Sequence, residues 1–143
     1  MRIMLASWPF WAVLSAVFAA LTAIFGKIGV ENINSDFATL IRTVIILVVL
    51  AAFVVATHAG QPLATVPHKT WAFLALSGLA TGASWVCYYR ALKIGPASGV
   101  APIDKMSVVL VALFAFLFLG ERLSAHNWAG IGLIALGAIL VAT

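Results

Sequence analysis

"GVAPIDKMSVVLVALFAFLFLGER", residues 99–122, is the stretch that decides what kind of fold this chain adopts. Residues 106–119 form a fourteen-residue apolar run in which Ser107 is the one polar side chain. A helix needs roughly 20 residues to cross the hydrocarbon core of a bilayer, which is about 30 Å thick. The stretch is long enough to do so, but Asp104 and Lys105 stand at its start, and these two charges need an explanation.

The composition of the whole chain points to the same environment. Of the 143 residues, 64% are hydrophobic and 8% are charged, which leaves too little polar surface for a soluble domain. An open strand cannot satisfy its backbone in lipid, and the apolar runs lack the alternation of a barrel strand. We therefore predict an all-α polytopic membrane protein with five transmembrane helices in a single domain, residues 1–143. The spans are expected at about 8–25, 37–57, 71–89, 100–119 and 125–141.

Several function classes are disfavoured by the sequence. It has no phosphate-binding or dinucleotide-binding glycine motif and no basic run, so the net charge of +4 suggests contact with anionic lipid headgroups and not with nucleic acid. The three histidines lack metal-ligand spacing, and no nucleophile, base and orienting group occur together. We expect no enzymatic activity, metal or cofactor. The first span outruns the apolar core of a signal peptide and is followed by more membrane segments, so we predict that it is not cleaved.

The basic residues barely indicate how the chain is oriented in the membrane. Five spans place the termini on opposite faces. The N-terminal face carries three basic residues, which are Arg2, Lys69 and Arg122. The other face carries five, which are Lys27, Arg42, Arg90, Lys93 and Lys105. Three of the last five lie within helix ends, and counting clear loop charges alone gives three against two. The positive-inside signal is nearly cancelled.

Four motifs resemble the EamA-type transporters of the drug/metabolite transporter superfamily. They are "FGKIG", "FATLIRT", "YYRALKIGPASGVAPI" and, most specifically, "FLFLGERLSAHNWAGIGLIALGAIL", in which an LGER turn precedes a Gly-rich last helix. The resemblance covers almost all of the chain. It implies half of an inverted-repeat fold, because typical members carry ten spans as two inverted five-helix units. The "DK" after Pro102 departs from the family pattern, so the family's substrate residues are not transferred to this chain.

Two helical faces carry small polar side chains. In the third span, Ser77, Thr81, Ser84 and Tyr88 recur at helical spacing, with Trp85 alongside. Hydroxyls are poorly satisfied in hydrocarbon, so this face is predicted to meet other helices or a water-filled cavity, with ordinary helix packing as the alternative.

Matching faces occur in two other spans. The first span offers Ser15 and Thr22 together with Ala19 and Gly26, so the two polar faces are expected to border one cavity. The Gly78 and Gly82 pair of the third span is expected to allow close helix approach. The small residues of the fifth span are assigned to helix contact alone.

The two charges of the fourth span are best placed near its end. Mid-membrane placement would cost roughly 5 to 7 kcal/mol, whereas a start near residue 100 leaves both charges roughly 6 to 8 Å inside. Adjacent helical residues point about 100° apart, so Asp104 and Lys105 are predicted not to pair with each other. Asp104 is expected to find a cation on another span, which could be Lys27, Arg42 or Arg90. Lys105 takes an acid, a carbonyl or a ligand, or acts as an anchor, and Pro102 lies in the first turn.

Arg42 stands a turn inside the second span, between Thr39 and Thr43. A guanidinium at that depth usually faces protein or water. Pairing with Asp104 or Asp36 is one interpretation, and contact with a ligand is the other. Embedded basic residues outnumber acids, which suits a carboxylate-bearing or zwitterionic ligand, with Asp104 as an amine or proton site.

These observations lead to two hypotheses. The first is a secondary transporter that exports small metabolites by alternating access through a polar cavity. The second is a non-transporting helical subunit that packs on another membrane protein. We expect the protein in the cell membrane, which in a bacterium is the inner membrane. We expect an antiparallel homodimer with dual topology, the competitors being a parallel dimer or a heterodimer with a separately encoded half.

Overall fold

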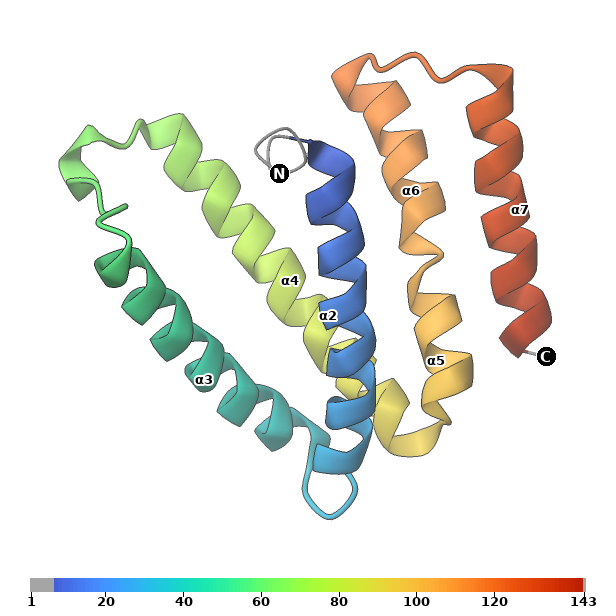
Figure 1. Cartoon of the computed structure of the whole chain (residues 1–143), viewed down its shortest axis with the longest axis horizontal. Coiled ribbons are helices and arrows are strands. Elements are labelled where there is room, and N and C mark those ends of the chain that lie inside the picture. Colours follow the sequence, from blue (N-terminus) through green and yellow to red (C-terminus); the bar gives the residue numbers. More distant parts are fainter. Residues whose placement is uncertain (1–6, 143) are drawn as a thin grey trace. The chain divides into compact units, whose positions relative to one another are not determined.

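The computed structural model of the protein describes residues 7–142, and all secondary structure among them is helical. Arg2, which enters the charge count, and Thr143 lie outside the described residues. Figure 1 shows the elements in chain order. They are α2 (Trp8–Gly29), α3 (Ser35–Ala56), the 3-10 turn η1 (Leu63–Thr65), α4 (His68–Ile94), α5 (Ala97–Asp104), α6 (Ser107–Phe114), the π-type turn η2 (Ala115–Leu119) and α7 (Ala125–Ala142).

Five helical segments are long and apolar enough to cross a membrane, which confirms the predicted fold class. They are Trp8–Gly29, Ser35–Ala56, His68–Ile94, Ala97–Leu119 and Ala125–Ala142. The third segment extends further than predicted at both ends, and the fourth begins at Ala97. Polar and charged residues fit inside these helix ends because long basic side chains reach polar partners while their stems stay in apolar surroundings. The chain is a multi-pass membrane protein.

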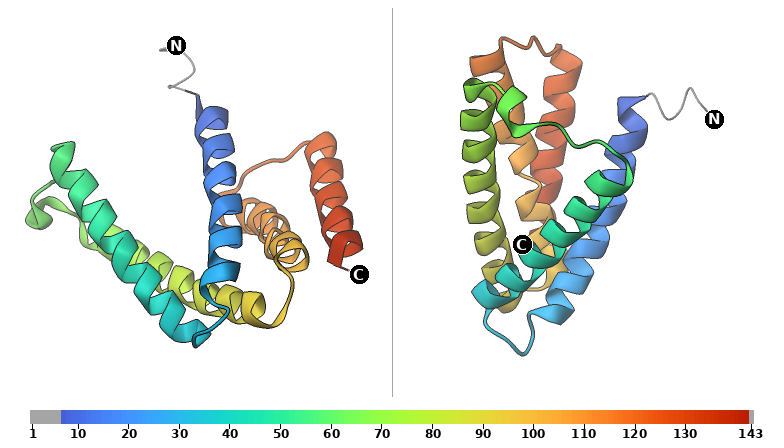
Figure 2. Two further views of the ribbon diagram at one scale, coloured as in Figure 1. Left: turned by 60° about the horizontal axis from the view of Figure 1, so that its bottom comes forward. Right: turned by 90° about the vertical axis from the view of Figure 1, so that its left-hand side faces the viewer.

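Two compact units make up the chain. The first, called here the α3–α4 unit, is Ile28–Lys93, and the second, called the α5–α7 unit, combines the residues up to Lys27 with those from Ile94 onward. Within the α5–α7 unit, Figures 1 and 2 show α6 and α7 running in opposite directions beside each other. The two units are described separately below.

The α5–α7 unit is held by the packing of α7 along α5 and α6. The rings of Phe116 and Trp128 meet edge to face with their centroids 6.4 Å apart. Ala112 and Ala138 are both buried, and small side chains of this kind let helix backbones approach closely in lipid. The fifth span therefore contacts other helices of the same chain where Ala138 is buried, whereas nothing lies within 4 Å of a Cβ built on Gly130, Gly132 or Gly137.

A glycine ends the fourth span and sets the turn that leads to α7. Gly120 adopts the left-handed conformation with φ 68°, and the backbone N–H of Glu121 donates to the carbonyl of Ala115 at 3.1 Å. This arrangement satisfies a carbonyl at the helix end, and it favours glycine because other L residues are strained there. Ser124 then caps the start of α7 by accepting from the N–H of Asn127 at 3.2 Å.

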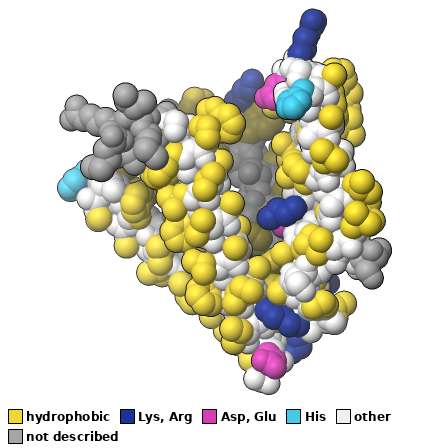
Figure 3. Space-filling view, turned by 45° about the vertical axis from the view of Figure 1, so that its right-hand side comes forward, with side chains coloured by type: hydrophobic (Ala, Val, Ile, Leu, Met, Phe, Trp, Pro, Cys, Tyr) yellow, Lys and Arg dark blue, Asp and Glu magenta, His cyan; other side chains and the backbone are white. Residues whose placement is uncertain are grey.

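Most large apolar side chains lie on the surface. Leu92 and Val30 are the large side chains that are fully buried among the described residues, while Leu47, Val55 and Leu79 are each more than two-thirds exposed. Figure 3 shows hydrophobic side chains spread over the visible face, with charged groups at a few places. A bilayer provides the apolar surroundings that such a surface requires.

Candidate functional site

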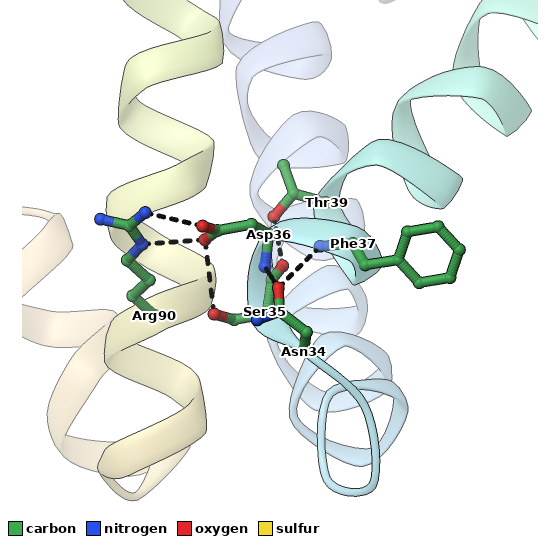
Figure 4. Close-up of polar contacts among 6 residues, drawn as sticks. All are labelled: Asn34, Ser35, Asp36, Phe37, Thr39 and Arg90. Carbon is green, nitrogen blue, oxygen red and sulfur yellow. Dashed lines mark hydrogen bonds and ion pairs between the residues drawn. The ribbon is translucent and has the colours of Figure 1, made fainter.

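The start of α3 and the end of α4 are joined by a network of polar contacts (Figure 4). Asn34 caps α3, with its side-chain oxygen accepting from the N–H groups of Asp36 and Phe37 at 2.9 and 3.1 Å. Asp36 in turn accepts two hydrogen bonds from Arg90, at 2.8 Å from Nε and 2.6 Å from Nη2. A bidentate pair of this geometry fixes both the distance and the orientation of the two helix ends.

Lys93 forms a second contact at this end of the α3–α4 unit. Its ammonium donates to the backbone carbonyls of Val30, Glu31 and Ile33 at 2.9, 2.6 and 3.1 Å. An ammonium group has three N–H donors, so the three carbonyls match its full capacity. The connection between the first two spans is thereby tied to the last turn of the third.

Arg42 lies further along α3 than Asp36, and its partners are on α4. Its guanidinium carbon is 4.1 Å from the ring centroid of Trp85 and 5.3 Å from that of Tyr89. Both distances are within the range of cation–π attraction. Tyr89 is buried, and Trp85 is half-buried. The aromatic rings hold the cation in place without neutralising it.

The predicted ion pairs of Arg42 are corrected by these contacts. Asp36 was considered as its partner, but Asp36 is taken by Arg90, and Arg42 stacks on aromatic rings instead. Arg90 is better placed for Asp36 because both residues lie at the adjoining ends of their helices. The Nη1 atom of Arg42 is buried and has no hydrogen-bond partner among the described residues.

The polar face of the third span is open within the chain. Ser77, Thr81 and Ser84 are exposed, and Tyr88 and Trp85 are half-buried. The Thr81 hydroxyl donates a hydrogen bond to the backbone carbonyl of Ser77 at 2.8 Å, so this hydroxyl is satisfied by its own helix. No atom lies within 4 Å of a Cβ built on Gly78 or Gly82, so no helix approaches this pair within the described chain.

Asp104 and Lys105 contradict the prediction that they do not pair. The ammonium of Lys105 lies 3.1 Å from the carboxylate of Asp104. The prediction assumed a continuous helix, but α5 ends at Asp104 and α6 begins at Ser107. Lys105 caps the end of α5 with right-handed helical angles (φ −69°, ψ −7°), so the two adjacent side chains still leave the backbone in different directions, and the pair forms because the long lysine chain turns back to its neighbour.

Pro102 precedes this interruption by one turn and is not in the first turn, as the sequence suggested. It is an interior residue of α5, which begins at Ala97. Proline has no N–H to donate to the carbonyl four residues earlier, and this weakens a helix locally. At the interruption the backbone bonds become short-range, with Met106 donating to Ile103 at 2.9 Å and Val108 donating to Lys105 at 3.0 Å.

The candidate residues of the first span are positioned on α2. Ser15 is exposed and Thr22 is half-buried, and the Thr22 hydroxyl donates to the carbonyl of Phe18 at 2.9 Å. Lys27, which was considered as a partner of Asp104, donates to the carbonyl of Gly95 at 2.8 Å. Asp104 forms an ion pair with Lys105.

Sequence reasoning missed Tyr89 and Lys93. Trp85 and Tyr89 are four residues apart and so share one face of α4, a spacing that could have indicated a stacking surface for a cation. Lys93 gave no comparable signal, because its three acceptors are backbone carbonyls that carry no side-chain pattern.

Comparison with known proteins identifies the chain's relatives. A profile of the EamA-like transporter family matches residues 6–143. A protein of Sinorhizobium sp named "uncharacterized transporter in cobO 3'region" is 64% identical over 136 residues, which is 95% of this chain and 96% of the relative. No solved structure matches significantly.

More distant relatives carry a more specific name, "probable 4-amino-4-deoxy-L-arabinose-phosphoundecaprenol flippase subunit ArnE". The protein of this name from Pectobacterium atrosepticum is 32% identical over 80 residues, which is 56% of this chain and 71% of the relative. That of Aeromonas salmonicida is 35% identical over 69 residues, which is 48% of this chain and 60% of the relative. With a family match that spans nearly the whole chain and five membrane-spanning helices, the protein belongs to the EamA-like transporter family, within the drug/metabolite transporter superfamily.

Proposed function

We propose that this membrane transporter is a secondary transporter that exports small metabolites of amino-acid-like or zwitterionic character. Its whole length acts as one domain, works as a dimer and gives the substrate alternating access to the two sides of the membrane. Membership of a transporter family supports the general function. The finer proposal rests on one observation, the interruption of the fourth span at Lys105 and Met106, directly after Asp104.

An interrupted membrane helix is costly unless its backbone groups serve a purpose. Discontinuous helices in secondary transporters supply backbone groups and helix ends to substrate and ion sites. Here the interruption carries an acid and a base that share an ion pair at 3.1 Å, with side chains that are 34% and 55% exposed. An ion pair with this much exposure can open, which frees Asp104 for an amine or a proton and Lys105 for a carboxylate.

The proposed pathway includes polar groups from both units, each considered in its own surroundings. Hydroxyl and aromatic side chains provide hydrogen-bonding and stacking positions, and the charged groups provide the recognition of a zwitterion. The proposed residues are Asp104, Lys105, Arg42, Ser77, Thr81, Ser84, Trp85, Tyr88, Ser15 and Thr22.

Transport measurements with two substitutions test the role of the interruption. Asp104→Asn and Lys105→Met are compared with the wild type in cells challenged with toxic amino-acid analogues and amphiphiles, at several pH values. Each substitution should lower export by at least about tenfold, since each removes a charge-assisted contact to the ligand, and Asp104→Asn should flatten the pH response. Lys69→Gln, which removes an exposed charge at the start of α4, serves as the matched control. Full export with an unchanged pH response in both variants would reduce the two residues to anchors.

The proposed dimer consists of two copies in opposite orientations, with the Gly and Ala face of α7 contributing to the contact. The nearly cancelled charge bias supports this arrangement. Around Gly132 and Gly137 no atom lies within 4 Å of a built Cβ, so this part of α7 is open to a neighbour. Reporters fused after Thr143, one active inside the cell and one active outside, should both give strong signals. A signal from only one of them would indicate a single orientation and a separately encoded partner.

One observation favours the alternative, a helical subunit that does not transport by itself. The ArnE relatives are named as subunits of a flippase. This alternative predicts that the chain alone gives no export for any compound of a wide panel, and that export appears only when a second membrane protein is produced with it.

A further inference from the structure

Arg42 occupies an unusual position for a charged side chain. It is the eighth residue of α3, which places it roughly 10 Å along the axis from the start of a helix that spans the membrane. Its side chain does not reach back to the charged end of the unit but lies against Trp85 and Tyr89 of α4. The cation is therefore held at depth by two aromatic rings.

The hydrogen bonds of this guanidinium are incomplete. Nη1 is buried and has no partner among the described residues. The neighbouring hydroxyls are used elsewhere, because Thr39 donates to the carbonyl of Ser35 at 2.8 Å and Thr43 donates to that of Thr39 at 2.7 Å. Asp36 is held by Arg90. A charged donor that is shielded from water and lacks an acceptor is unfavourable, so the arrangement calls for an acceptor from outside the chain.

The geometry restricts what this acceptor is. Contact with the two rings satisfies none of the N–H groups on the edge of the guanidinium, which still need an oxygen acceptor. Carboxylates and phosphates suit that edge because they accept two parallel N–H bonds. On α4, Thr81 lies one turn before Trp85, and Trp85 lies one turn before Tyr89, so each neighbouring pair shares one side of the helix. Thr81 is exposed, so a hydroxyl lies one turn away from the first of the two rings.

We propose that Arg42, stacked on Trp85 and Tyr89, binds the carboxylate or phosphate group of a ligand within the α3–α4 unit. This anionic group belongs either to the transported solute, in which case the inference rests on the transporter function proposed above, or to the headgroup of a membrane lipid. In both cases the aromatic rings position the guanidinium, and the ligand accepts hydrogen bonds from it.

Binding of a matched pair of probes tests this site without any transport. Full-length protein in nanodiscs of phosphatidylcholine is titrated with phenylacetate and with its neutral analogue phenylacetamide, and binding is followed by saturation-transfer NMR of the probe. Wild-type protein should prefer phenylacetate by at least about tenfold, the effect expected of a charge-assisted bidentate contact. Arg42→Gln should remove this preference, and Trp85→Leu should reduce it. Arg122→Gln, which removes an exposed arginine outside both helices, should leave it unchanged.

Two further arms keep the result decisive. If Arg42→Gln does not give a monodisperse protein, Arg42→Lys replaces it, since a lysine keeps the charge but loses the two parallel bonds, and the preference should fall without disappearing. Nanodiscs that contain phosphatidylglycerol identify the source of the anion. Competition by this lipid with phenylacetate assigns the site to a headgroup, and a lack of competition assigns it to a solute.

The site and the transporter function fail in different ways. Equal binding of phenylacetate and phenylacetamide by wild-type protein, or a preference that survives in Arg42→Gln, would overturn the anion site even if export is intact. A clear preference that depends on Arg42 in a protein that exports nothing would support the site and count against the transporter function.

Discussion

The carboxylate of Asp36 receives two hydrogen bonds from the guanidinium of Arg90, at 2.8 and 2.6 Å, and thereby joins the first turn of α3 to the last turns of α4. The two side chains are 45% and 61% exposed, so the pair lies where water and salt reach it. Since Asp36 also stands at the positive end of the α3 dipole, its negative charge is favourable there even without Arg90.

A double-mutant cycle on this pair should give losses that do not add. Asp36→Asn and Arg90→Gln each break the bidentate contact, so the double variant should lose less thermal stability than the sum of the two single variants. The coupling should shrink at high salt because the pair is exposed. Thermal unfolding of the purified protein in detergent, monitored by circular dichroism, gives the measurement. Additive losses at low salt would mean that the contact does not form in the membrane protein.

The charge-reversed variant provides a sharper version of the same test. Asp36→Arg combined with Arg90→Asp restores the attraction between the two positions but puts a positive charge at the positive end of α3. We therefore expect partial recovery relative to either single reversal. Complete recovery would show that the helix dipole contributes little at this position.

Gly120 should be the glycine that tolerates substitution least in the turn before α7. Its φ of 68° lies in the left-handed region, so Gly120→Ala should cost about 1 to 2 kcal/mol of folding free energy, and Gly120→Asn should cost less. Gly29→Ala is the control, since that residue lies in a helix and an added Cβ meets nothing. Reversible unfolding in mixed detergent micelles provides the comparison. The prediction fails if Gly120→Ala and Gly29→Ala unfold at the same midpoint.

Replacing Pro102 should make the fourth span more stable and the transporter slower. Pro102→Ala returns a backbone N–H to the interior of α5 and should add roughly 1 to 3 kcal/mol to the stability of that helix. If the interruption at residues 105–106 serves transport, a more continuous helix should export more slowly. Hydrogen exchange at residues 103–108 and the export rate are measured on the same variant. Slower exchange with unchanged export would separate the interruption from transport.

The number and kind of helices followed from the sequence because apolar length alone determines which segments cross a bilayer. The predicted end of the third span, residue 89, lies too early, since Arg90 and Lys93 are charges without known partners until their acceptors are found in the structure. Those acceptors are a carboxylate 54 residues away and a set of carbonyls about 60 residues away. Sequence spacing within one helix carries no information about such distant contacts.

The candidate site was predictable in its residue types but not in its pairings. Arg42 and Trp85 were both singled out, yet their stacking depends on how α3 and α4 face each other. The error on Asp104 and Lys105 has a different origin, because the rule for adjacent helical residues left out the length and flexibility of the lysine side chain. Pro102 was placed in the first turn because the predicted start of the span, residue 100, lies three residues after the observed start at Ala97.

The three carbonyl contacts of Lys93 have a consequence for the order in which the protein is made. Lys93 lies about 60 residues downstream of the connection that it fastens, between the first and second spans. A ribosome must therefore complete the third span before Lys93 can bind this connection. Until then the first two spans are a helical hairpin whose connection lacks the three hydrogen bonds that later hold it to the end of α4. The order of synthesis thus delays the closing of this end of the α3–α4 unit until Lys93 has been made.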